Sequence, residues 1–126
     1  MIGRNQPREQ HVALRSSGTR LHSALQELLA AIADVEAGGW DVDHVRLPKH
    51  YALALMAAIG EERLDRAQLA DTLGLVERFG AELALRRWLR GNHPPEELDA
   101  AAEAVLEQLA VYRAALQEAT TRAAAT

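Results

Sequence analysis

The stretch RAQLADTLGLVERFGAELALRRWLRG, residues 66–91, decides how the middle of this chain folds. As a single helix it carries small and apolar residues on one face at alternating spacings of four and three: Leu69, Leu73, Val76, Gly80 and Leu83. Two glycines inside such a helix would each cost about 1 kcal/mol relative to Ala. Gly80 lies on the stripe, where it would let another helix approach closely. Gly74 lies off the stripe, and a single helix gives it no purpose.

A pair of helices is the alternative, because a turn at Gly74 would use the positive φ that Gly adopts readily. Ala70, four residues earlier, is small enough for two such helices to pack closely. With HYALALMAAI, residues 50–59, as the preceding helix, the segment resembles the helix-turn-helix of MarR-like winged regulators. The matching positions are Leu64, Leu69, Ala70, Leu73, Gly74, Leu75, Leu83 and Gly91. The resemblance implies a DNA-binding transcriptional regulator that uses residues 66–90, with Ala70 and Gly74 at the turn.

The chemistry of residues 76–90 favours a protein partner over DNA. That family carries a β-branched residue and a Leu where this chain has Gly80 and Arg87, and no wing follows Gly91. Residues 61–91 hold six Arg and six acidic residues, whereas a phosphate-binding surface is plainly basic. Trp and Arg are enriched at protein interfaces. The candidate interaction residues are Arg78, Arg86, Arg87, Trp88 and Arg90.

The two ends of the chain carry long amphipathic stripes that are typical of helices in a bundle or coiled coil. The first stripe is Leu14, Gly18, Leu21, Leu25, Leu28, Ile32 and Val35, and the second is Leu98, Ala102, Val105, Leu109, Tyr112, Leu116 and Ala119. The first helix would begin near Glu9 or at residues 16–19 and end at Gly38. Pro95 followed by two Glu predicts the start of the last helix.

Seams as narrow as these favour self-association, most simply as a two-fold dimer. The predicted dimer seam is Leu21, Leu25, Leu28 and Ile32 of the first helix with Leu98, Val105, Leu109, Tyr112 and Leu116 of the last. A monomeric four-helix bundle is the competing interpretation.

Between the ends, residues 40–48 are expected to connect to a short helix over residues 48–60, which Pro48 begins and Gly60 ends. That helix is apolar nearly all round, which predicts burial in the middle of the fold. The fold class is therefore all-α, a four-helix bundle-like domain over residues 9–120. Residues 1–8 are expected to be disordered and residues 121–126 frayed.

The amino-acid composition excludes several classes of function and partner. The 126-residue chain has no Cys, so disulfides and thiolate chemistry are excluded. The apolar run at residues 51–60 is too short to cross a bilayer, and the N-terminus lacks the apolar core of a signal peptide. We therefore expect a cytoplasmic protein with no membrane partner. A net charge of −4 gives no general attraction to nucleic acid.

Catalytic and metal-binding signals are weak. His11 and His22 share one side of a predicted helix without a carboxylate at the spacing of bundle metal sites. The run from Asp41 to His44 lacks the glycine and distal Glu of a calcium loop. No phosphate-binding or nucleophile motif occurs. We expect no cofactor, no metal and no enzymatic activity. The favoured function is protein–protein interaction by a homodimer or with another protein, and DNA binding is the alternative.

Overall fold

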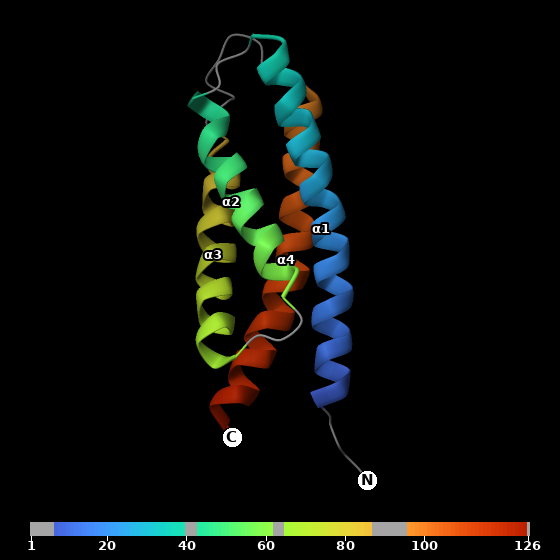
Figure 1. The fold of residues 1–126 in the computed structure, drawn as a ribbon, viewed down its shortest axis with the longest axis vertical. Coiled ribbons are helices and arrows are strands. Elements are labelled where there is room, and N and C mark those ends of the chain that lie inside the picture. The colour runs from blue at the N-terminus through green and yellow to red at the C-terminus, as the bar shows by residue number, and fades with distance from the viewer. Residues whose placement is uncertain (1–6, 40–42, 62–64, 87–95, 126) are drawn as a thin grey trace.

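The computed structural model describes residues 7–39, 43–61, 65–86 and 96–125, and it confirms the predicted all-α fold. Its four helices are α1 (Pro7–Ala37), α2 (Asp43–Ile59), α3 (Arg66–Leu85) and α4 (Glu96–Ala125). Successive helices run in opposite directions along the long axis (Figure 1). The chain therefore forms an up-down-up-down bundle, the arrangement that short connections between helices favour.

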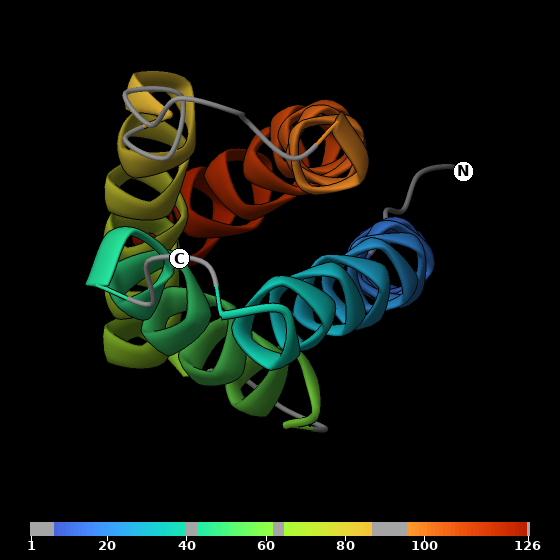
Figure 2. The same ribbon diagram turned by 90° about the horizontal axis from the view of Figure 1, so that it is seen from above.

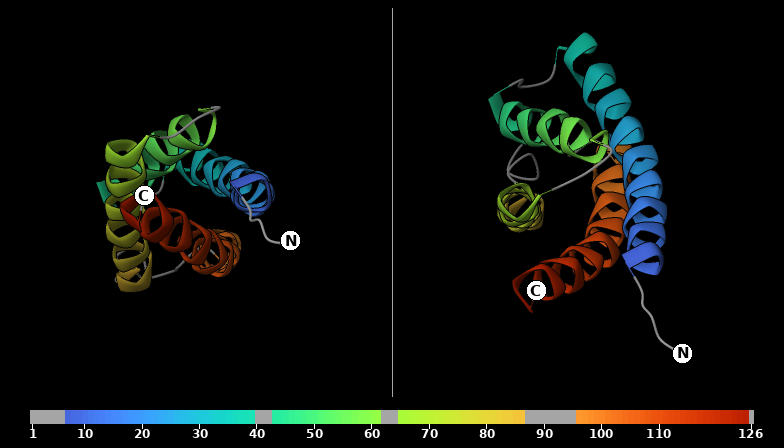
Figure 3. Two further views of the ribbon diagram at one scale, coloured as in Figure 1. Left: turned by 90° about the horizontal axis from the view of Figure 1, so that it is seen from below. Right: turned by 60° about the horizontal axis from the view of Figure 1, so that its bottom comes forward.

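The helices pack as a ring around one interior. α1 packs most extensively against α4, α3 packs against α4, and α2 lies against α1 and α3. The view along the long axis shows this interior between the four helices (Figure 2). An oblique view shows α2 and α3 on one side of the pair formed by α1 and α4 (Figure 3). The two interfaces that α2 makes, with α1 and with α3, are therefore the least extensive of the four.

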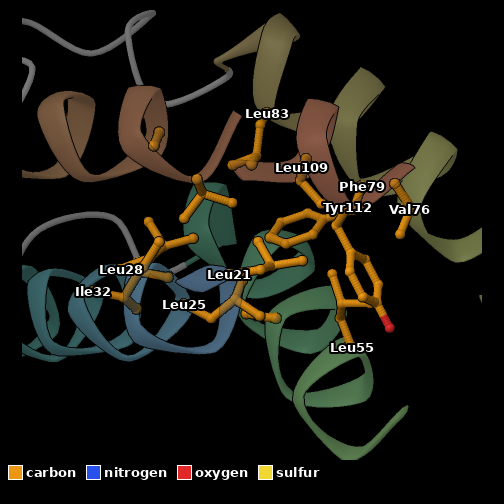
Figure 4. Packing of buried hydrophobic residues seen from close by; sticks show 14 of the residues in the cluster. Leu21, Leu25, Leu28, Ile32, Leu55, Val76, Phe79, Leu83, Leu109 and Tyr112 are labelled. Carbon is orange, nitrogen blue, oxygen red and sulfur yellow. The ribbon is translucent and has the colours of Figure 1, made fainter. Parts of the chain in front are cut away.

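All four helices contribute to the core, which is shown in part in Figure 4. Its fully buried side chains include Leu21 and Leu25 of α1, Leu55 of α2, Phe79 of α3 and Tyr112 of α4. The Phe79 ring also packs against the half-buried Tyr51 ring, with centroids 5.9 Å apart. Burial of a large apolar side chain stabilises the fold by about 1.5–3 kcal/mol, so these residues dominate the packing energy.

The segment that the sequence left open is one helix, so the predicted turn at Ala70 and Gly74 is wrong. α3 runs unbroken from Arg66 to Leu85. It starts at a capping box, in which the Asp65 carboxylate accepts from the Gln68 backbone N–H and the Gln68 side chain accepts from the Asp65 N–H, each at 2.8 Å. Burial of four apolar side chains on one face (Leu69, Val76, Phe79 and Leu83) outweighs the helix-propensity cost of the two glycines.

Helix ends differ from expectation at several points. α1 begins at Pro7, close to the earlier expected start, and Gly39 follows it with a φ of +80°. α2 begins at Asp43, so Pro48 lies in its second turn instead of starting it. α4 continues to Ala125, past the end expected at residue 120. Within the described ranges, no helix combines the length and apolarity needed to cross a bilayer.

Gly18 lies where three helices come close together. A Cβ atom at this position of α1 would lie 3.3 Å from Ile59 Cγ2 of α2 and 3.3 Å from Tyr112 Cε1 of α4. Any larger side chain would therefore push against both neighbours. Glycine in the apolar stripe of α1 allows the Tyr112 ring to enter the core at this level.

Candidate interaction surface

The predicted dimer seam lies inside one chain, which contradicts its assignment as a contact between subunits. Its nine residues belong to the buried core: Leu21, Leu25, Leu28, Ile32, Leu98, Val105, Leu109, Tyr112 and Leu116. The reason is the extensive packing of α1 against α4, which brings the two stripes together. An amphipathic stripe shows that a helix face is buried, but not which chain buries it. Within the chain, the stripes of α1 and α4 therefore cover one another.

Arg86, one of the predicted interaction residues, is bound to α4 within the chain. Its Nη1 lies 2.6 Å from Asp99 Oδ1, and its Nη2 contacts Glu103. Only 17% of its side chain is exposed, and its buried Nε has no hydrogen-bond partner. Burial lowers the pKa of Arg86, but the hydrogen bonds and charges of Glu103 and Asp99 outweigh burial and raise it. The Arg86 guanidinium therefore links the end of α3 to α4.

Of the other predicted interaction residues, the structure describes only Arg78. Arg78 is exposed on the outer side of α3, and its Nη1 would lie 3.8 Å from a Cβ atom at Gly74. The neighbouring Glu77 carboxylate pairs with Arg113 of α4 at 3.0 Å. Arg87, Trp88 and Arg90 lie outside the described residues. With α3 unbroken and Arg86 engaged, the helix-turn-helix interpretation loses the geometry on which it depended.

The surface that the sequence did not reveal lies on α2. Because α2 is apolar nearly all round, it was expected to be buried, but the structure covers it on one side only. Val45, Ala52 and Leu55 face the core, whereas Leu53 is 52% exposed and Leu47 is 40% exposed. The other exposed large apolar residues of the described chain occur singly on three different helices: Val12, Leu85 and Val111.

We define the outer face of α2 by the side that α1 and α3 leave uncovered. Its members are Arg46, Leu47, His50, Leu53, Ala54, Ala57, Gly60 and Glu61. All are exposed except Ala54, which is half-buried. Gly60 and Glu61 extend the helical turn past Ile59, since their backbone N–H groups donate to Met56 and Ala58 at 3.1 and 3.2 Å. The charges of this face stand at its two ends, and its middle is apolar apart from His50.

Beside this face, α2 is tied to α1 by an ion pair between Lys49 Nζ and Glu36 Oε1 at 3.3 Å. In the part of the chain that the structure describes, no group of three or more His, Asp and Glu is placed to hold a metal ion. The chain matches no protein-family model, no curated protein and no solved structure.

Proposed function

We propose that this protein is a non-enzymatic helical module that binds another protein chain through the outer face of α2. The observation that carries the proposal is the exposure of Leu53 and Leu47 on a helix whose apolar residues surround it. A helix that is apolar all round is normally buried on every side. Contiguous exposed apolar surface marks sites of protein interaction.

Covering this face with a partner would contribute favourably to the free energy of binding. Full burial of a Leu side chain stabilises a complex by about 1.5–3 kcal/mol relative to exposure, and Leu53 and Leu47 are each about half-exposed. Covering both would therefore contribute about 1.5–3 kcal/mol, with small side chains around them offering little steric resistance. The face carries its charges at its two ends and, apart from His50, is apolar between them, which resembles the polar rim and apolar centre of a protein interface.

The proposal is tested by a photo-reactive amino acid placed at position 53 of the full chain in its native cells. The matched control carries the same group at Ser23, an exposed residue on the outer side of α1. We expect irradiation to join position 53, but not position 23, to a protein of defined mass. A chain that remains unlinked from position 53, or that links equally from both positions, would overturn the proposal.

A further inference from the structure

We infer that the partner of the outer face of α2 is a second copy of this chain, with the two α2 helices antiparallel about a two-fold axis between Leu53 and Ala54. This inference rests on the proposed function and names the occupant of its surface. A two-fold interface must be complementary to itself, because the same patch is used by both subunits. The outer face of α2 meets that requirement in the size and in the charge of its residues.

Side-chain size divides the face into two halves. The half toward the start of α2 carries the large residues Leu47, His50 and Leu53, and the half toward its end carries Ala54, Ala57 and Gly60. Antiparallel pairing about the stated axis brings the two Leu53 side chains together at the centre. It also sets His50 of each copy at the level of Ala57 in the other copy. Away from this central pair, large residues therefore lie at the level of small ones, which permits close packing of the two helices.

Charge favours the same orientation. Arg46 stands at one end of the face and Glu61 at the other; both are exposed, and Arg46 also has an interaction within its own chain. Antiparallel helices bring Arg46 of one copy close to Glu61 of the other at both ends of the contact. A parallel pair would instead place Arg46 beside Arg46 and Glu61 beside Glu61. Antiparallel pairing also aligns the positive end of each helix dipole with the negative end of its neighbour.

Sedimentation equilibrium of the full chain tests the second copy directly, at concentrations from about 10 µM to 1 mM, which covers the weak range expected of a small interface. We expect a monomer–dimer equilibrium that is weakened at least about tenfold by Leu53→Glu. The control is Val111→Glu, an exposed apolar residue of α4 that the inference leaves outside the contact. Ala57→Arg provides a second disrupting variant, and circular dichroism of each variant checks that the helices are retained.

Orientation is tested with single cysteines, which report cleanly because the chain has none of its own. Near the axis, two copies of Ala54→Cys come within the range of a disulfide. Two copies of Ala57→Cys are displaced by about 10 Å along the helices and do not. We expect Ala54→Cys to form a linked dimer under mild oxidation and Ala57→Cys to remain monomeric. Equal linking of both variants would indicate a parallel pair and would overturn the inference.

The outcomes separate this inference from the proposed function. A chain that stays monomeric at 1 mM, or a dimer that survives Leu53→Glu, overturns the second copy as occupant. If position 53 then cross-links to a different protein in cells, the proposed function stands with another partner. If position 53 yields no specific adduct at all, the proposed function fails as well.

Discussion

Gly18 of α1 and Tyr112 of α4 meet so closely that a Cβ atom on Gly18 would lie 3.3 Å from Cε1 of the ring. Tyr112 is only 2% exposed and therefore has little room to move away. The contact couples the two longest helices at one point of the core. Several properties of the protein follow from this contact and from the helix ends described above.

Replacing Gly18 by Leu is expected to lower the free energy of unfolding by about 1–3 kcal/mol, since the added side chain must displace Tyr112 and Ile59. The matched substitution is Gly80→Leu, where a Cβ atom would meet nothing within 4 Å. Urea unfolding followed by circular dichroism measures both. Equal stability of the two variants would show that the three helices do not meet closely at Gly18.

The glycines inside α3 are expected to behave as ordinary helical positions. Gly74→Ala and Gly80→Ala should each stabilise the protein by about 0.5–1 kcal/mol, because Ala is the better helix former and both sites have space. Gly39→Ala should instead destabilise it, because Gly39 has a φ of +80°. Thermal unfolding distinguishes the cases. A loss of stability in Gly74→Ala would point to the turn that the structure lacks.

Burial raises the pKa of Tyr112 from an ordinary value of 10 to about 12. Above pH 10 the unfolded chain therefore releases this proton more readily than the folded chain does. The stabilisation associated with the neutral hydroxyl is complete below pH 10 and is lost as the pH rises toward 12. The loss amounts to about 3 kcal/mol for a difference of two pKa units.

Tyr112→Phe is expected to escape this alkaline loss. The free energy of unfolding, measured in urea at intervals from pH 8 to pH 12, should fall less steeply in the variant than in the unmodified protein. Parallel curves for the two proteins would mean that the hydroxyl of Tyr112 titrates normally in the folded state.

Arg86 combines an ion-pair role with an unusual backbone conformation, since its φ is +47° at the end of α3. Arg86→Ala should destabilise the protein by about 1–3 kcal/mol through loss of the charged hydrogen bonds to Asp99 and Glu103. Arg86→Gly removes the same bonds but relaxes the backbone, so it should be about 1 kcal/mol more stable than Arg86→Ala. An Ala variant at least as stable as the Gly variant would contradict the left-handed cap.

Local signals predicted much of this structure. The stripes on α1 and α4 depend on neighbours within the same helix, and both were visible in the sequence. Gly74 suggested a turn that does not form, because helix propensity is a local quantity and long-range burial of Phe79 and Leu83 overrides it. The pairing of Arg86 had a faint signal in the two carboxylates four residues apart on α4, Asp99 and Glu103.

The sequence could not predict which helices pack against one another. That packing determines which helix face stays exposed and becomes the candidate surface. The stripes of α1 and α4 are equally suited to another chain or to one another, and only the fold shows that they cover one another. The apolar circumference of α2 predicted burial on all sides. Its exposed face appears only once α2 is placed between α1 and α3, with no helix of the described chain beyond it.

The extensive packing of α1 against α4 also constrains the order of events during synthesis. α1 leaves the ribosome first, but the helix that covers its leucines is the last of the four to be translated. At ordinary translation rates the delay is on the order of several seconds. During that time the leucine stripe of α1 is available to chaperones and to neighbouring nascent chains. The bundle therefore closes only after α4 has been translated, when the first and the last of the four helices can pack together.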